Sequence, residues 1–521
     1  MVARGSQLRP WPGAESSVRR ARRFRDALRD PQRAQAETLG RILRIVAGSP
    51  YARALGVAAD LSYDTFVARV PIVGYEDLRP WIDREAATGV PQLSSEPAVL
   101  FERTSGSSGK SKLVPNTRSL LESFNACFVI WASDVLKHGP RLETGRMFWG
   151  VSPAIETGAR TPHGTPISLA DDAGYLAPRY QGLLARLLVA PTELKRITDG
   201  EAYRRALAAV LVAEPELEIV SVWSPTYLLA ILDTITTRRD EIIADLLSGR
   251  TGPRGEIELR AGAPARASLL ADDLIRWDWV WPQLKLVSCW TDAAAGTFVP
   301  ALRQAFPQAL IQGKGLLATE AALTVPLFGA PAPVPLVDEV FLEFESGDGG
   351  GIVRRLHELE EGAEYGIVVS QTGGFLRYRM GDRVQVAGRV GRTPCLKFLG
   401  RAGCSSDLAG EKLDEALARA VLAAELGPDG HCSYLTPMTN PPGYCCITDH
   451  SAAAVDPEAL ARRLDHALSC SFQYRQARHL GQLNPLRVRY RADARPAYEA
   501  AQMGRGLRWG NIKFTALLSL R

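Results

Sequence analysis

The stretch LFERTSGSSGKSKLVPNTRSLLESF, residues 100–124, places a loop rich in serine, glycine and lysine between an apolar run and a helical pattern. Glycines let backbone N–H groups approach an anion, while Ser, Thr and Lys side chains add donors and positive charge. Apolar residues on both sides predict a buried strand before the loop and a packed helix after it: Val99, Leu100, Phe101, Leu120, Leu121, Phe124, Phe128 and Trp131. The stretch therefore predicts a polyphosphate cradle inside an α/β domain.

This loop does not match the nucleotide-binding P-loop, G-x-x-x-x-G-K-[ST]. Gly109-Lys110-Ser111 supplies the end of that motif, but Thr104 stands where the first glycine is required. Three residues, Leu113 to Pro115, also separate the loop from the next helix, which Ser119 and Glu122 predict to begin with a capping box. A solvated Ser/Gly linker is the alternative interpretation, which the apolar flanks disfavour. The phosphates would be held by the loop itself.

Composition is that of an ordinary soluble protein. The 521 residues are 46% hydrophobic and 23% charged, and no run approaches the ~18 apolar residues of a membrane span. Eight arginines in the first thirty residues predict a frayed tail followed by a solvated helix, and they account for much of the net charge of +5. Because no aromatic stacking platform accompanies them, we expect no nucleic-acid partner. We also expect no membrane partner.

The eight cysteines favour a reduced, cytoplasmic enzyme over a disulfide scaffold. They form no C-x-x-C pair, and no Cys/His cluster has the spacing of a zinc site. The sequence thus predicts no metal held by the protein alone. It carries no signal of oligomeric state, and a monomer is compatible with it.

The pattern along the chain predicts an α/β fold in two domains. Helices dominate up to about residue 95, buried strands alternate with helices up to about residue 327, and Val337 to Phe398 shows the alternation of a β-rich subdomain. Past residue 400 the order becomes helix, strand, strand, helix, strand. We therefore expect a large N-terminal domain over residues 1–400, with layered sheets, and a small, mobile α+β domain over residues 401–521.

Three further residues combine with the loop. Glu320 follows an apolar run in LLATEAALTVP, Asp382 lies in a predicted Gly-Asp turn in LRYRMGDRVQV, and Lys412 is predicted to start a helix in SSDLAGEKLDE. Taken singly, each has an ordinary structural interpretation: a capping carboxylate, a turn residue and a solvated helix lysine.

Together these stretches resemble the adenylate-forming (ANL) superfamily, and within it the Gretchen Hagen family of auxin-responsive acyl acid amido synthetases, more its bacterial than its plant branch. The resemblance runs in order from about residue 35 to the C-terminus. It is carried by VPIVGYEDLRPWIDR, TSGSSGKSK, WSPTYLL, ATEAA, YRMGD, FLGR, GEKLDE and YRQARHLGQLNPLRV. It implies a large adenylate-forming domain closed by a small lid, and an enzyme that uses ATP and Mg²⁺.

The resemblance also implies site residues. Lys412, Glu320 and Lys112 would be catalytic, and Glu320 would help to hold Mg²⁺. The nucleotide would contact Thr104, Ser105, Gly106, Ser107, Ser108, Gly109, Ala294, Leu317, Ala318, Thr319, Glu320, Asp382, Arg401 and Lys412. Asp382 would bind the ribose hydroxyls, and Arg401 would lie at the domain hinge. The acyl pocket would include Phe124, Phe128, Trp223, Ser224 and Thr226.

The sequence departs from the plant pattern at several positions. Ser107 replaces a threonine, Leu317 belongs to a stretch that lacks an aromatic residue, and Phe514 replaces a proline, which puts a role for Lys513 in doubt. The expected reaction activates a carboxylic acid as acyl-AMP and transfers it to an amine. Alternatives are transfer to a thiol such as coenzyme A or to a hydroxyl, and a non-catalytic nucleotide-binding protein. The identities of the acid and the acceptor stay open.

Overall fold

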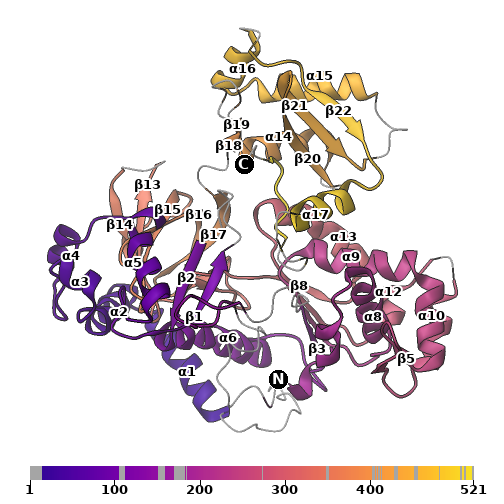
Figure 1. Cartoon of the computed structure of the whole chain (residues 1–521), viewed down its shortest axis with the longest axis horizontal. Coiled ribbons are helices and arrows are strands. Elements are labelled where there is room, and N and C mark those ends of the chain that lie inside the picture. The colour runs from indigo at the N-terminus through magenta and orange to yellow at the C-terminus, as the bar shows by residue number, and fades with distance from the viewer. Residues whose placement is uncertain are drawn as a thin grey trace.

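A computed structural model shows the chain as a wide base with a smaller unit above it (Figure 1). The structure describes residues 14–518 except 105–111, 151–158, 169–181, 183–184, 273, 348–350, 402–404, 407, 409–410, 412, 428–431, 451–455, 480–481, 505–506, 508 and 510–511. One side of the base holds the N-terminal helices and a β-rich region, and the other holds a parallel sheet with its helices. The small unit is built from the last part of the chain.

Five helices form the N-terminal layer: α1 (Ala14–Ala27), α2 (Pro31–Val46), α3 (Pro50–Ala54), α4 (Tyr63–Arg69) and α5 (Tyr75–Thr88). The basic segment is not a solvated helix, because α1 buries Phe24 and packs along α6, and Leu28 just after it is also buried. Arg20 forms ion pairs with Asp338 and Glu339. Part of the basic charge at this end is therefore neutralised within the molecule.

Two paired strands flank the serine-rich stretch. β1 (Ala98–Thr104) pairs antiparallel with β2 (Lys112–Thr117), and Thr104 is the register partner of Lys112. The helix that follows, α6 (Arg118–His138), is capped by Thr117, whose hydroxyl accepts from the Leu120 N–H at 3.3 Å, so the predicted capping by Ser119 is wrong. This pairing holds the two described ends of the stretch in register.

α6 is the one described helix long and apolar enough to cross a membrane by length and composition. Half of its most apolar window is buried inside the molecule, and its buried positions recur along the whole helix. It lies at the centre of the base, against α1, β2, β10 and β11. These contacts make it a core helix of the fold.

The parallel sheet has the order β3-β4-β7-β8, and every neighbouring pair in it is parallel. Its strands are β3 (Met147–Trp149), β4 (Ile219–Ser221), β7 (Leu286–Cys289) and β8 (Leu310–Gly313). The surrounding elements are η2 (Thr192–Arg196), α8 (Gly200–Val212), α9 (Pro225–Thr237), α10 (Arg239–Ser248), β5 (Arg250–Thr251), β6 (Ile257–Glu258), α11 (Ala263–Arg266), η3 (Ala267–Leu270), α12 (Trp277–Val280), η4 (Ala293–Phe298) and α13 (Val299–Ala305). The strands predicted around 219–223, 284–290 and 309–327 are confirmed.

After β8 the chain forms short hairpin strands and then an antiparallel sheet of order β14-β13-β15-β16-β17. The short strands are β9 (Leu317–Ala318), β10 (Ala321–Ala322), β11 (Thr324–Val325) and β12 (Val334–Pro335). The sheet contains β13 (Phe341–Ser346), β14 (Val353–Arg355), β15 (Glu364–Ser370), β16 (Tyr378–Val390) and β17 (Thr393–Arg401), with η5 (Leu356–Glu358) beside it. The predicted β-rich region is confirmed.

The last part of the chain builds a three-stranded sheet of order β20-β21-β22, with helices packed on it. Its elements are β18 (Ser405–Ser406), β19 (Leu413–Asp414), α14 (Glu415–Leu426), β20 (Ser433–Thr439), β21 (Pro442–Thr448), α15 (Pro457–Leu468), α16 (Phe472–His479), β22 (Arg487–Tyr490) and α17 (Ala494–Gly504). The helix predicted at Lys412 begins only at Glu415, because Leu413 and Asp414 pair with Ser406 and Ser405. The other predicted elements are confirmed.

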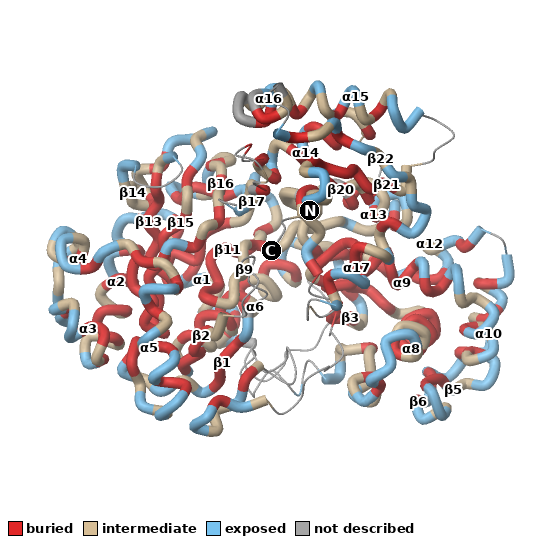
Figure 2. The backbone as a smooth tube through the Cα atoms, turned by 45° about the horizontal axis from the view of Figure 1, so that its top comes forward, coloured by how far each residue is buried: buried red, intermediate tan, exposed pale blue. Residues whose placement is uncertain are grey.

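Burial divides the interior into several hydrophobic clusters (Figure 2). One joins the N-terminal helices to the β-rich sheet, and another surrounds the parallel sheet. The small unit has its own cluster, but its final segment packs on the base: Trp509 lies edge-on to Tyr227 at 4.7 Å between ring centroids, and Phe514 contacts Phe298 at 5.1 Å. The end of the chain therefore docks the small unit onto the parallel-sheet side.

Candidate nucleotide and acyl-acid site

Glu320 lies in the two-residue turn of the β9–β10 hairpin. Ala318 pairs with Ala321, so Thr319 and Glu320 form the turn, and Gln371 donates to the Glu320 carbonyl at 3.1 Å. Just before the hairpin, a Cβ on Gly315 would lie 2.1 Å from the Thr324 carbonyl oxygen, so only glycine fits there. The hairpin is held firmly, and its Glu320 is only 6% exposed.

Asp382 lies within β16 rather than in a turn between strands. Gly381, with φ of 77°, accommodates the irregular backbone at this point, and β16 continues on both sides of it. Asp382 is the register partner of Arg401 at the end of β17, and the Arg401 Nε lies 3.2 Å from Asp382 Oδ1. Arg401, predicted at a hinge, is therefore also the ion-pair partner of Asp382.

Two lysines complete this group. Lys513, in the final segment of the chain, places its ammonium 4.9 Å from the ring centre of Trp290. Lys112, at the start of β2, lies over the ring of Tyr75 at 5.1 Å. We call Glu320, Asp382, Arg401, Lys112 and Lys513 the charged cluster. Its members come from the hairpin, the β-rich sheet, the loop end and the C-terminal segment, which are far apart in sequence.

The charges of this cluster act on one another. Burial raises the pKa of Glu320, and the charges of Arg401 and Lys112 oppose this while Asp382 adds to it. Burial also raises the pKa of Asp382, against the positive charges of Arg401 and Lys513. Although Lys513 keeps access to solvent, desolvation lowers its pKa, and Asp382 opposes that shift. Two buried carboxylates that share nearby cations form a site suited to a bound cation or to a charged ligand.

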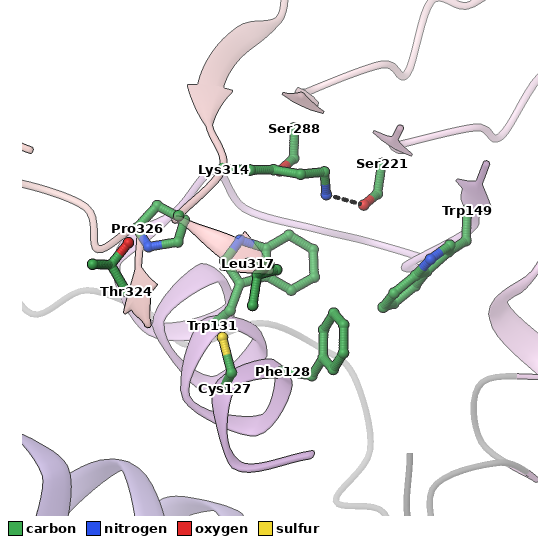
Figure 3. Close-up of a pocket in the computed structure, with 11 residues that line it drawn as sticks. Cys127, Phe128, Trp131, Trp149, Ser221, Ser288, Lys314, Leu317, Thr324 and Pro326 are labelled. Carbon is green, nitrogen blue, oxygen red and sulfur yellow. Dashed lines mark hydrogen bonds between the residues drawn. The ribbon is translucent and has the colours of Figure 1, made fainter. Parts of the chain in front are cut away.

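An aromatic pocket includes Leu317 of the hairpin that carries Glu320 (Figure 3). Its walls come from α6, β3 and the hairpin strands, and its polar side comes from the ends of β4, β7 and β8. It is lined by Cys127, Phe128, Trp131, Trp149, Ser221, Ser288, Lys314, Gly315, Leu317, Thr324 and Pro326. Because the carboxyl ends of neighbouring parallel strands meet at one edge of a sheet, residues of three strands converge here. Leu317 belongs to both the pocket and the Glu320 hairpin.

The structure separates the predicted acyl-pocket residues. Phe128 lines the pocket, and the Lys314 ammonium lies 5.0 Å from the ring centre of Trp223. Phe124 points into the hydrophobic core and is not among the lining residues. Ser224 and Thr226 are also absent from the lining, because they bond to each other at 2.6 Å and cap α9.

Several predicted nucleotide contacts cannot be located from the structure. Ser105, Gly106, Ser107, Ser108, Gly109 and Lys412 lie outside the described residues, and only the backbones of Thr104 and Ala294 are described. Leu317, Ala318 and Thr319 lie beside Glu320 in the hairpin. Within the described part of the chain, no group of three or more His, Cys, Asp or Glu residues is arranged to hold a metal.

Sequence reasoning missed Trp131, Trp149, Ser288, Trp290 and Lys314. Trp131 lies one turn beyond Phe128 on α6, which was an available signal for a shared face. Ser288 and Lys314 lie at the carboxyl ends of predicted strands, where crevice residues are expected. Trp290 can be recognised as a site residue only from its contacts with Trp223 and Lys513. These contacts join distant parts of the chain.

Comparison with known proteins gives one consistent answer. The GH3 family N-terminal domain matches residues 20–311, and the GH3 family central domain matches residues 334–401. An indole-3-acetic acid-amido synthetase, GH3.8 of Oryza sativa subsp. indica, is 25% identical and aligns over 93% of this chain and 88% of its own length. GH3.2 of Arabidopsis thaliana, with the same activity in its name, is 24% identical over 89% and 94%. The solved structure of the GH3.15 acyl acid amido synthetase superposes with a TM-score of 0.80 at 19% identity, covering 96% of this chain and 94% of that one.

Proposed function

Because the chain belongs to the GH3 family, it is an acyl acid amido synthetase, an ATP-dependent ligase that adenylates a carboxylic acid and conjugates it to an amine, and we propose that the charged cluster is its nucleotide site. The observation that carries this proposal is the convergence of Glu320 and Asp382 with three cations beside an aromatic pocket. Family membership favours an amine over a thiol or hydroxyl as the acceptor.

The reaction has two steps. An oxygen of the acid's carboxylate attacks the α-phosphorus of ATP, the bond to the β-phosphate oxygen breaks, and pyrophosphate leaves. The amine nitrogen then attacks the acyl carbon, the carbon–oxygen bond to AMP breaks, and the nitrogen loses a proton. Because negative charge collects around the α-phosphate, the protein's main task is to neutralise it.

The triphosphate is assigned to the segment from Thr104 to Lys112. In support, Thr104 and Lys112 are register partners, so the two described ends of this segment lie side by side and the strand after it starts with a lysine. The charge of Lys112 acts on Glu320, which places the start of β2 beside the carboxylates. Asp382 would accept hydrogen bonds from the ribose hydroxyls, since an ionised carboxylate only accepts. Arg401 favours that ionised form.

The residues present fit a Mg²⁺ that arrives with the nucleotide. Burial and the neighbouring Asp382 raise the pKa of Glu320, so a cation beside the two carboxylates would relieve the cost of ionising them. Such an ion would neutralise phosphate charge and polarise the phosphorus–oxygen bonds when bound. Glu320 is the residue we assign to it.

The acid is assigned to the aromatic pocket. Phe128, Trp131 and Trp149 offer flat apolar walls to the body of the acid, while Leu317 connects the pocket to the Glu320 turn. The reacting carboxylate would therefore face the hairpin. Exclusion of water from this region protects the mixed anhydride until the amine attacks.

The small unit is proposed as a mobile lid, with the division between the two domains near residue 400. In support, its sheet has a hydrophobic cluster of its own, and its final segment packs on the base through Trp509 and Phe514. Lys412 would reach the α-phosphate when the unit closes. Lys513 already acts on Asp382 in the present arrangement and is a second candidate for that charge.

Pyrophosphate release is the decisive measurement. The purified chain is assayed with ATP, Mg²⁺ and a panel of aromatic, aliphatic and indole acids, each with and without a mixture of amino acids and amines. We expect release with at least one acid, and an amide product identified by mass spectrometry only when amine is present. Asp382→Asn should raise the KM for ATP about tenfold or more, because a charged acceptor is lost. Release without any amide from any amine would contradict the proposal.

We also propose a branch of the family and a cellular setting for this chain. A bacterial branch of the family is supported by Ser107, by the absence of an aromatic residue near Leu317, and by Phe514. A reducing cytoplasmic setting is supported by the cysteines, since all seven that the structure describes are free thiols and six of them are buried.

A further inference from the structure

The polar side of the aromatic pocket contains an ammonium group that the adenylation chemistry does not use. Lys314 follows β8 directly and donates from Nζ to the Ser221 hydroxyl at 2.9 Å (Figure 3). The same ammonium lies over two indoles, 5.0 Å from the ring centre of Trp223 and 5.9 Å from that of Trp131. An ammonium group over indole faces is attracted by the negative potential of the rings.

A second, independent observation lies beside it. Ser288 is 1% exposed, and within the described part of the structure its hydroxyl has no hydrogen-bond partner. Ser288 is the register partner of Ser221 on the neighbouring strand, so both hydroxyls and the ammonium line one side of the pocket. A buried hydroxyl left without a partner costs free energy of roughly 1–3 kcal/mol, which a ligand oxygen would recover.

Aromatic rings lie between this polar side and the charged cluster. Contacts run from Lys314 to Trp223, from Trp223 to Trp290 at 5.8 Å between centroids, and from Trp290 to Lys513. A pair of indoles thus links the Lys314 ammonium to the charged cluster, in which the α-phosphate is assigned. An acid whose carboxylate faces Glu320 would turn another part of its body toward Lys314.

We propose, on the basis of the proposed function, that Lys314 and Ser288 select an aromatic acid that carries a second oxygen acceptor, a ring carboxylate or a ring hydroxyl, away from the reacting carboxylate. Lys314 is a specificity-determining residue: its ammonium donates to this oxygen together with the Ser288 hydroxyl. The aromatic walls of Phe128, Trp131 and Trp149 hold the ring between the two ends. An apolar acid of the same shape would offer no oxygen to either group and would leave the Ser288 hydroxyl without a hydrogen-bond partner.

The test compares matched acids in the pyrophosphate assay: benzoates and phenylacetates with a methyl, a hydroxyl or a second carboxylate at the 3- or 4-position. We expect kcat/KM for the best oxygen-bearing acid to exceed that of its methyl analogue at least tenfold. Lys314→Met should bring this ratio to about one, through a higher KM for the oxygen-bearing acid. Ser288→Ala should reduce the ratio in part, and Lys314→Arg should keep most of it.

Controls separate specificity from folding and from the proposed function. Lys137→Met, an exposed lysine on α6, should leave every ratio unchanged, and melting curves check that each variant folds. Quenching of tryptophan fluorescence by the oxygen-bearing acid gives binding without turnover, because Trp131 and Trp223 lie against Lys314. If the dicarboxylate is preferred over the hydroxy acid, the group that binds Lys314 and Ser288 is a carboxylate. If the hydroxy acid is preferred, that group is a neutral hydroxyl.

Three results would overturn the inference. They are a wild-type preference for the methyl acids, a Lys314→Met variant that loses activity equally with every acid, and fluorescence binding that does not depend on Lys314. Acid binding that depends on Lys314 without any pyrophosphate release would instead overturn the proposed function alone.

Discussion

Asp382 and Arg401 face each other across β16 and β17 as register partners, and their side chains form an ion pair of 3.2 Å. The pair joins the assigned ribose ligand to the last residue before the small unit. Burial raises the pKa of Asp382, and the largest opposing influence is the charge of Arg401. The ionised form of Asp382 thus depends on a residue at the edge between the two parts of the molecule.

Replacing Arg401 with Gln should weaken ATP binding in a pH-dependent way. Without the guanidinium the pKa of Asp382 rises further, so the acid limb of kcat/KM for ATP moves to higher pH. At pH 7 the KM for ATP should rise about tenfold. Arg401→Lys should restore part of the affinity. Arg383→Gln is the matched control, because Arg383 lies on β16 beside Asp382 and forms an exposed ion pair with Glu364 on β15. A parallel loss at every pH would contradict this role.

Replacing Glu320 with Gln should stabilise the free enzyme while abolishing adenylation. The folded pKa of Glu320 is raised, so its contribution to stability is present at low pH and is lost as pH rises through that pKa. The variant should therefore melt above the wild type at pH 8, with a gap that shrinks toward pH 5. Pyrophosphate release should fall at least 100-fold. A gap that grows as pH falls would show that the carboxylate is held ionised in the free protein.

The sequence predicts which segments contribute to the site, but it does not predict which of their residues contact one another. The carboxyl ends of β4, β7 and β8 follow from short apolar runs, and Glu320 and Asp382 follow from motifs carried by single stretches. Lys513 and Trp290 meet only in the folded chain, more than 200 residues apart. No sequence pattern within either stretch predicts that contact.

Local signals also failed where tertiary contacts compete with them. Asp382 follows a glycine, which favours a turn, yet pairing with β17 extends the strand through both residues. Ser224 and Thr226 follow Trp223 in the chain, but their hydroxyls bond to each other, and the Ser224 hydroxyl caps α9. The basic first helix was expected to be solvated, whereas carboxylates over 300 residues away bind Arg20.

Replacing Arg20 with Met should destabilise the folded chain. Its guanidinium donates to both oxygens of Asp338, at 2.9 and 3.0 Å, and to Glu339 at 2.6 Å, and the group is largely buried. Loss of these bonds should lower the free energy of unfolding by about 2 kcal/mol, measured by urea denaturation. Arg19→Met, one residue away in an exposed pair with Glu15, should change nothing measurable. If Arg20→Met lowered the free energy of unfolding no more than Arg19→Met does, α1 would not belong to the part of the chain that unfolds cooperatively.

Alanine at Lys412 and at Lys513 separates the two candidates for the charge on the α-phosphate. Loss of a cation that acts mainly in the transition state should lower pyrophosphate release about 100-fold or more while ATP affinity changes less than threefold. The pKa of Lys513 is lowered by desolvation, so a rate that depends on its ammonium should decline on the alkaline side below the usual range of a lysine. Lys513→Arg should remove that decline. Lys397→Ala, an exposed lysine on β17, is the control. If only Lys412→Ala affects the rate, Lys513 is a structural contact of Trp290.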